Sequence, residues 1–367
     1  MSKINKINKI NKINKINKIN QSIADIYDQL VDGEDYISTL LIVTDTIIRT
    51  RCISDVEDNM FLPNHIRLHI LQNITHSITY KTVINGKNLQ LTFSSFKKST
   101  KGPIISDKQL NSVFLIIYLL SLYSGKKCSQ QLDINIFLTP FKKQLPIKKN
   151  ATIGVEHVNT GFTHSGCNIK SEIVIFREEE WFKVLIHELF HNFHIDFSTR
   201  NISKVTRQLR VFCRIDSDFA IYETYCETWA RILNCFIKIF LQTENITLFK
   251  IDFNKSIELE RVFSLKQADL IMKQFSSQSD YKEDSNVFCY YILTACLMND
   301  YSGFIEWCHI NNPDFIKFRD TDKNVEAFAM LIMEKLEDPT FNQGIATVKK
   351  FNIGNTKSLR MTAGDPP

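Results

Sequence analysis

One segment near the middle of the chain, residues 178–198, limits the possible folds more than any other. It reads EEEWFKVLIHELFHNFHIDFS, and its apolar residues recur with the period of a helix. The positions that form one apolar face are Phe182, Leu185, Ile186, Leu189 and Phe193. We expect the three glutamates at 178–180 to occupy the first helical turn, where negative charge complements the helix dipole. The segment therefore predicts a helix buried in the core.

Two histidines on this helix have the spacing of a metal site. His187 and His191 are four residues apart, so both rings project from one face, separated by about one turn. Two imidazoles at this separation can hold one zinc ion. Glu188 lies roughly 100° around the helix from His187, where its carboxylate can meet a water held by the metal. Such a site hydrolyses bonds with Glu188 as the general base and acid, whereas the alternative is two core histidines on an apolar helix.

A second helical pattern, at residues 218–240, carries acidic residues that could complete such a site. Glu223 and Glu227 are four apart and share one helix face. No glycine and histidine follow His191 at the places required by the longer pattern HExxHxxGxxH. The arrangement instead resembles that of gluzincins, the HExxH metallopeptidases whose third zinc ligand is a glutamate some tens of residues downstream. Glu223, Glu227 and Ala230 match the spacing of the gluzincin glutamate helix.

The resemblance implies a ligand set and a supporting residue. One Zn²⁺ per chain would be held by His187, His191 and Glu223. Glu227 would accept the imidazole N–H of one ligand histidine and so fix its tautomer and orientation. The family usually has an aspartate where Glu227 stands. Because both carboxylates share one helix face, Glu227 stays open as the alternative third ligand.

Three further side chains are candidates for contacts to a substrate or a transition state. His194 follows His191 by three residues and lies near the ligand stripe or at the surface. His157 flanks an expected edge strand, and Tyr290 lies in a later helical pattern. Either could donate a hydrogen bond to an oxyanion. Ordinary polar contacts for His157 and core packing for Tyr290 are the alternatives.

The surrounding pattern predicts an α+β fold. Asn85-Gly86 between alternating segments at 79–94 indicates a hairpin. Further extended segments are expected at 132–139, 151–163 and 171–177. The resemblance implies a zincin-like fold, with a small mixed β-sheet over the HExxH helix and a mostly helical C-terminal subdomain. It also implies an edge strand along the cleft, so that a peptide or protein substrate binds in extended form as another strand.

The chain divides into five regions on this interpretation. Residues 1–20 form an INK repeat whose period of three fits neither a helix nor a strand, so we expect disorder. The others are a mainly helical N-terminal region at 21–78, a catalytic core at 79–244, the helical subdomain at 245–350 and a flexible tail at 351–367. Apolar runs at 36–50 and 112–125 are shorter than the ~20 residues of a spanning helix, so both are expected as buried helices and no transmembrane segment is expected.

Charge and cysteine usage narrow the partners and the compartment. The formal net charge is +5, but residues 1–20 hold six of the 45 basic residues and no acidic one, which leaves 39 basic against 40 acidic residues. The folded part therefore gives no indication of nucleic-acid binding. The nine cysteines are odd in number and form no CxxC, which favours reduced thiols in an intracellular protein. No apolar leader of a secreted protein is visible.

The sequence therefore predicts a zinc-dependent metallohydrolase, specifically a peptidase. The competing prediction is a structural or binding protein derived from a zincin, such as a virion component, with little or no catalysis. Abundant Ile, Asn and Lys resembles the composition of proteins from A/T-rich genomes, including those of large DNA viruses. Residues 173–198 resemble an uncharacterised putative metallopeptidase group of such viruses, which would place the protein in the host cytoplasm or the virion.

Overall fold

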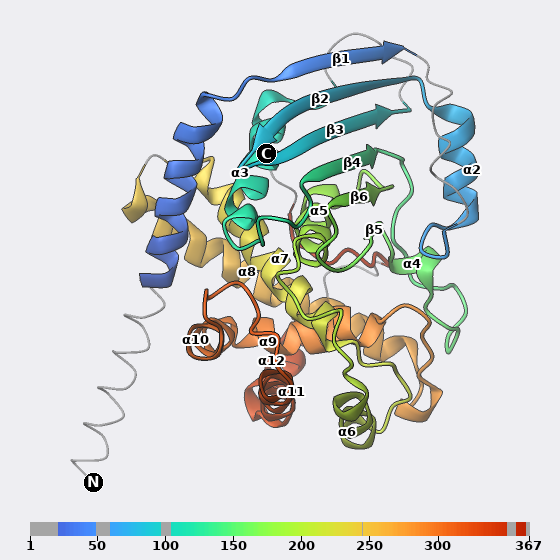
Figure 1. Ribbon diagram of the computed structural model, residues 1–367. Helices are drawn as coiled ribbons and strands as arrows, with labels where there is room; N and C mark the ends of the chain where they lie inside the picture. Colours follow the sequence, from blue (N-terminus) through green and yellow to red (C-terminus); the bar gives the residue numbers. More distant parts are fainter. Residues whose placement is uncertain (1–20, 49–58, 97–103, 244, 351–356, 365–367) are drawn as a thin grey trace, which may run out of the picture.

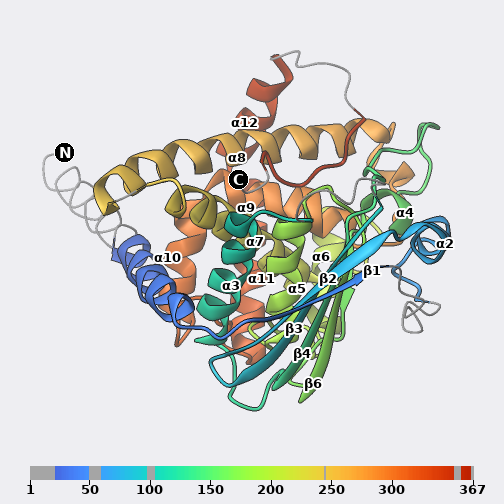
Figure 2. The same ribbon diagram turned by 90° about the horizontal axis from the view of Figure 1, so that it is seen from above.

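The computed structural model describes residues 21–48, 59–96, 104–243, 245–350 and 357–364. Within them, a six-stranded mixed sheet packs against a larger layer of helices (Figures 1 and 2). The expected combination of a mixed sheet with many helices is confirmed. The INK repeat at 1–20 lies outside the described residues.

The sheet has the strand order β1-β2-β3-β4-β6-β5. The strands β3, β4 and β6 run parallel, and the pairs β1–β2, β2–β3 and β5–β6 are antiparallel. Their bounds are Val43–Ile48 for β1, His76–Ile84 for β2, Lys87–Ser95 for β3, Gln131–Phe137 for β4, Gly161–Thr163 for β5 and Lys170–Ile175 for β6. The short strand β5 is therefore an edge of the sheet.

The predicted hairpin is confirmed. Asn85 and Gly86 connect β2 to β3 as a two-residue loop, with φ of 47° and 76°. Positive φ at both positions is what a type I′ turn requires, and Asn-Gly adopts this conformation with the least strain. The loop fixes the register of the two strands, with Ile84 opposite Lys87.

Helices make up most of the rest of the described chain. The buried helix expected from the apolar run at 112–125 is confirmed as α3, which ends at Ser121. The region after residue 245 is helical as predicted. None of the described helices is long and apolar enough to cross a membrane. Besides a helix at residues 21–38, the elements are α2 Asn64–Asn73, α3 Asp107–Ser121, α4 Val155–Val158, α5 Trp181–Asn192, α6 Ser203–Cys213, α7 Ile221–Phe240, α8 Ile246–Gln274, η1 Gln278–Asp280, η2 Phe288–Leu293, α9 Thr294–Asn299, α10 Tyr301–Asn311, α11 Asp322–Glu337 and α12 Pro339–Lys350.

The helix α5 lies at the centre of the molecule, between the sheet and α7 (Figure 2). The side chains of β6 point alternately to the two faces of the sheet, and one of these faces packs against α5. Ile173 and Ile175 face the main core that contains α5, whereas Val174 faces the opposite side and packs with α2. All twelve residues of α5 are buried. Because each large apolar side chain buried there contributes about 1.5–3 kcal/mol, α5 is firmly fixed before any ligand is considered.

The expectation of a buried helix at 36–50 is wrong. The N-terminal helix ends at residue 38, and β1 pairs with β2 at the edge of the sheet. Leu41 is 89% exposed and Val43 59% exposed. The run from Val43 to Ile48 is rich in β-branched residues, which favour a strand. The strand β1 also joins the N-terminal region to the sheet that carries β5 and β6; residues 49 and 50 lie outside the described part.

Two expectations about the segments that precede α5 also need correction. The helix begins at Trp181, and Glu180 precedes it with a φ of 62°, so residues 178–180 are not its first turn. The Glu180 carboxylate is fully buried and pairs with Lys143 Nζ at 2.5 Å. Tertiary pairing has thus overridden the dipole preference. The extended segment expected at 151–163 contains the short helix α4 before β5 begins.

The expectation of a flexible tail is wrong for residues 357–364. Leu359 is fully buried and Met361 is 4% exposed. Backbone hydrogen bonds join this segment to residues 143–145, and Tyr291 Oη donates to Leu359 O. The polar groups of this segment are satisfied inside the protein, because Thr362 Oγ1 and Ala363 N both donate to the buried Glu260 carboxylate.

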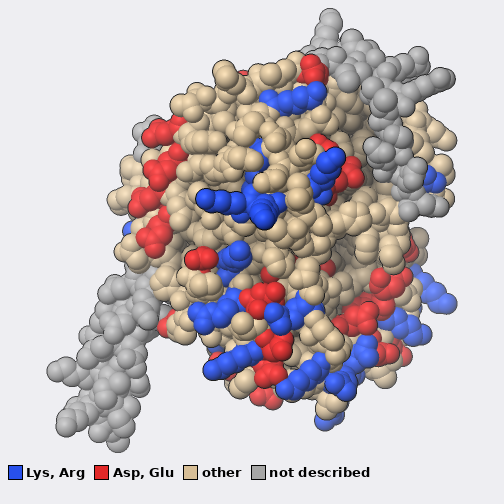
Figure 3. All heavy atoms as spheres, in the orientation of Figure 1, with Lys and Arg blue, Asp and Glu red and all other residues tan. Residues whose placement is uncertain are grey.

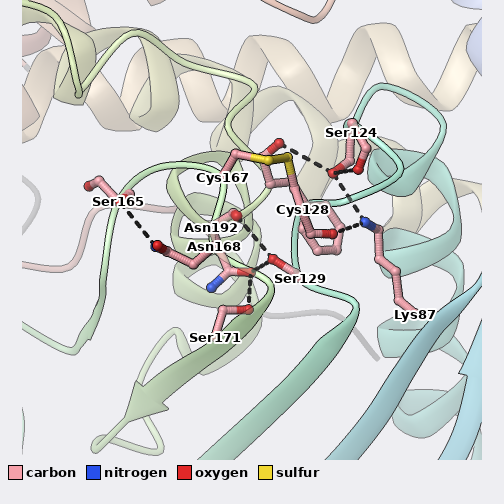
Figure 4. The surroundings of a disulfide bond; sticks show 11 residues. Lys87, Ser124, Cys128, Ser129, Ser165, Cys167, Asn168, Ser171 and Asn192 are labelled. Carbon is pink, nitrogen blue, oxygen red and sulfur yellow. Dashed lines mark hydrogen bonds between the residues drawn. A yellow bond between two sulfur atoms is a disulfide. The ribbon is translucent and has the colours of Figure 1, made fainter.

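The expectation of reduced thiols is wrong for one pair. Cys128 and Cys167 form a disulfide between the loops that precede β4 and β6 (Figure 4). Six other described cysteines are free, and Cys52 lies outside the described residues. The two cysteines are 39 residues apart and come close only because β4 and β6, which follow them, pair in the sheet. The disulfide could therefore not be predicted from the sequence.

Candidate metal centre

Three side chains from two helices converge on one point. His187 and His191 lie on α5, and their Nε2 atoms are 3.2 Å apart. Glu223 in the first turn of α7 places its Oε2 3.0 Å from the His187 Nε2 and 3.2 Å from the His191 Nε2. The three donor atoms therefore form a nearly equilateral triangle, which requires the packing of α5 against α7.

This triangle fits a zinc ion. Zinc bonds of about 2.0–2.1 Å at tetrahedral angles place neighbouring donor atoms about 3.3 Å apart. The observed separations of 3.0–3.2 Å are close to that value. Two imidazole nitrogens and one carboxylate oxygen also form the donor set of known catalytic zinc sites, which leave a fourth position open.

The outer side of His191 is held by a carboxylate. Its Nδ1 lies 2.6 Å from Asp196 Oδ2, and Asp196 is 1% exposed. An acceptor at Nδ1 keeps the proton there and leaves Nε2 free to bind a cation. Cys226 Sγ lies 3.8 Å from the same Nδ1. The cluster of His191, Asp196 and Cys226 therefore shares a histidine with the triangle and supports it from behind.

The outer side of His187 faces Glu227. The Glu227 Oε2 lies 3.2 Å from His187 Nδ1, on the opposite side of the ring from Glu223. Lys183 Nζ donates to both Glu227 oxygens, and Arg231 Nε donates to one of them at 3.0 Å. The two acids that the sequence could not separate thus occupy different places, since Glu223 meets both Nε2 atoms and Glu227 is engaged behind one ring.

The charges of the triangle are coupled. Burial opposes protonation of His187, but Glu223 and Glu227 outweigh it and raise the pKa. Burial is likewise overcome at His191, where Cys226, Glu223 and Asp196 raise the pKa. At Glu223, burial favours the neutral acid, yet the two histidines lower the pKa. A cation bound at Nε2 has to displace these imidazole protons, so binding is coupled to proton release.

Glu188 points into the same site and differs from the other acids. It is 7% exposed, and its carboxylate makes no hydrogen bond or ion pair to the described part of the chain. Burial raises its pKa, and the neighbouring His187 and His191 only partly offset that effect. A buried carboxylate with a raised pKa and a free acceptor is suited to take up and return a proton near neutral pH.

A cavity of about 290 Å³ opens onto the triangle. One wall is the edge strand β5 with its flanking residues, from Val158 to Ser165. Tyr290 lines another wall, with its ring centroid 5.8 Å from that of His187. Glu188 and Met361 also line the cavity, so the C-terminal segment contributes to the site.

Not all sequence candidates reach this cavity. The structure brings together His187, Glu188, His191, Glu223 and Tyr290 at the cavity, and Glu227, which also lines it, lies beside His187 Nδ1. His194 follows the end of α5 with a φ of 54°, and it does not line the cavity. The His157 Nδ1 accepts a hydrogen bond from Gly154 N within α4 and is likewise outside the cavity wall. Neither side chain is therefore part of the cavity wall.

Several supporting residues were not predicted from the sequence: Asp196, Lys183, Arg231 and Met361. Two of them carried a detectable signal, because Lys183 precedes His187 by four residues and Arg231 follows Glu227 by four. Asp196 lies beyond the end of α5, and Met361 is distant in sequence, so only the tertiary fold places them.

On the face shown in Figure 3, acidic and basic side chains are interspersed over the helical half of the molecule.

No family model matches the chain, and comparisons with curated proteins and with solved structures found no match. Any function proposed for this chain must therefore be argued from the geometry of the site.

Proposed function

We propose that this chain is a zinc-dependent metallopeptidase of the gluzincin type. The observation that carries the proposal is the convergence of His187 Nε2, His191 Nε2 and Glu223 Oε2 at mutual distances of 3.0–3.2 Å. These three residues would hold the ion. A zinc ion supplies Lewis-acid chemistry, polarising a carbonyl group and acidifying water.

The chain's own residues have separate tasks in this proposal. Glu188 takes the proton of the attacking water and returns it to the leaving amine, a role supported by its raised pKa and free carboxylate. Asp196 accepts the Nδ1 proton of His191, and the Glu227 carboxylate, 3.2 Å from His187 Nδ1, stabilises that ring by its charge. Tyr290 would donate to the oxygen that becomes negative during attack, a role supported by its position in the wall of the same cavity.

The edge strand supports a peptide as the substrate. Only β6 is paired with β5 in the described sheet, and the residues around β5 line the cavity. An extended peptide can add its backbone to such an edge, which would bring its scissile bond close to His187, His191 and Glu223. A mixed sheet over the HExxH helix and a helical region after it are the arrangement that a zincin-like fold would have.

The test is hydrolysis of a diverse peptide mixture, with cleavage sites identified by mass spectrometry. We expect cleavage by the zinc-loaded protein, its loss on chelation and its return with zinc. Glu188→Gln should bind zinc and cleave nothing, whereas Glu178→Gln, next to the helix but outside the cavity, should cleave normally. Stoichiometric zinc without cleavage would instead favour the binding protein, and a folded protein without zinc affinity would overturn the proposal.

A further inference from the structure

Lys183 is a buried cation behind the metal site. It lies one turn before His187 on α5, and its side chain is 2% exposed. Its Nζ donates to Glu227 Oε1 at 3.0 Å and Oε2 at 2.7 Å. Burying a lysine costs several kcal/mol unless it is paired with an anion in good geometry. The place of Lys183 in the core therefore depends on Glu227, and the orientation of Glu227 depends in turn on Lys183.

The contacts of Glu227 show what Lys183 contributes. Arg231 Nε binds only Oε1, at 3.0 Å, and a carboxylate held at one oxygen can still rotate about its last torsion. Lys183 binds both oxygens and removes that freedom. The oxygen at 2.7 Å from Lys183, Oε2, is the one that lies 3.2 Å from His187 Nδ1.

The C-terminal segment covers this arrangement. Met361 Sδ lies 3.6 Å from Lys183 Nζ, and the backbone N–H groups of Met361 and Thr362 donate to Glu180. The Glu180 carboxylate also pairs with Lys143 at 2.5 Å. Lys183 and Met361 both line the cavity of the site, and Glu180 is already bound by Lys143 and by these two N–H groups. Glu227 is the carboxylate that Lys183 binds.

We propose that Lys183 is a positioning residue of the metal centre. By holding both oxygens of Glu227, it fixes this carboxylate 3.2 Å from His187 Nδ1 and so directs Nε2 toward Glu223 and His191. This inference depends on the proposed zinc site. Loss of a residue that supports a ligand typically weakens metal affinity 10–100-fold. Lys183 is one contact further away, and we expect a loss of about tenfold.

The experiment measures zinc affinity by competition with a chromophoric chelator, on the full chain. Lys183→Met should weaken zinc binding about tenfold and shift the visible spectrum of the cobalt-substituted protein, because His187 is misdirected. Lys183→Arg, which keeps the charge and can bind both oxygens, should restore most of the affinity. Lys87→Met is the matched control, since Lys87 is 3% exposed and contacts the far end of α5 through Phe193.

A double-mutant cycle separates positioning from general destabilisation. In a Glu227→Gln background, Lys183→Met should change zinc affinity less than twofold, and this comparison remains available if Lys183→Met alone does not fold. The inference is overturned if folded Lys183→Met binds zinc and cobalt like the wild type, or if its loss is the same in both backgrounds. Failure of the wild type to bind zinc would reject the proposed function instead.

Discussion

The two sides of the ligand histidines differ in how their acids are paired. Behind the rings, Glu227 is bound by Lys183 and Arg231, and Asp196 is bound by His191. In front, Glu188 faces the cavity without a bonding partner in the described chain. A buried carboxylate is costly when unpaired, so the back stabilises the structure and the front keeps an acid available. The difference separates residues that build the site from the residue that would react.

The largest effect is expected from the front. Glu188→Gln should lower peptide hydrolysis by about 10²–10⁴-fold, the range for loss of a general acid–base group. Zinc affinity should stay within about threefold, because Glu188 lies outside the donor triangle. Removal of an unpaired buried acid should leave the Tm unchanged or raise it. Turnover assays, zinc titration and thermal unfolding measure the three outcomes, and a large loss of zinc would place Glu188 among the ligands.

The back should respond in the opposite manner. Glu227→Gln leaves Lys183 and Arg231 buried with a neutral partner, which should cost about 3–5 kcal/mol of stability. Zinc affinity should fall about 10–100-fold because the charged carboxylate beside His187 Nδ1 becomes a neutral amide. Chemical denaturation and chelator competition measure both. A fully stable Glu227→Gln protein would contradict the separation of the two sides.

The pH dependence of zinc binding tests the charges of the triangle. Without metal, the raised pKa values of His187 and His191 contribute stability at low pH, and that contribution is lost as pH rises through the folded-state pKa values. Zinc requires neutral imidazoles, so its affinity should weaken as pH falls, by about tenfold per unit for each proton released. The rise in Tm caused by zinc should therefore grow with pH. Zinc affinity independent of pH between 6 and 8 would contradict coupled protonation.

The smallest effect on zinc affinity is expected from the disulfide near the C-terminal end of α5. The disulfide-bearing loop reaches this end through a hydrogen bond from Gly166 N to His191 O, and Ser129 Oγ donates to Asn192 (Figure 4). Cys128→Ser with Cys167→Ser should lower stability by about 2–4 kcal/mol through loss of the cross-link. Zinc affinity should change less than threefold, since the ligand rings are held elsewhere. A larger zinc loss in the folded variant would show that this end also positions the site.

The parts of the site that could be predicted from the sequence are those set by helical spacing. The intervals from His187 to His191 and from Glu223 to Glu227 place each pair on one face, and burial of α5 and α7 follows from their apolar residues. The same spacing could not choose between Glu223 and Glu227, because that choice depends on how α7 rotates against α5. The sheet was predictable where turn chemistry decided it, as at Asn85 and Gly86.

Elements fixed by distant contacts were not predictable. The segment 357–364 has the composition of a frayed tail, yet it is buried because Glu180 and Glu260 accept its backbone and hydroxyl donors. Residues 36–50 were apolar enough for a core helix, but pairing with β2 turned part of them into an edge strand. In both places the tertiary partner decided the conformation.

The metal centre is tested directly by measuring zinc stoichiometry and affinity for the wild type, Glu223→Ala and Glu227→Ala, each checked for folding. We expect one tightly bound zinc per wild-type chain, near-complete loss of binding in Glu223→Ala and weakened binding with retained stoichiometry in Glu227→Ala. A folded wild-type protein that binds no zinc, or a Glu223→Ala variant that binds it like the wild type, would contradict the proposed metal centre.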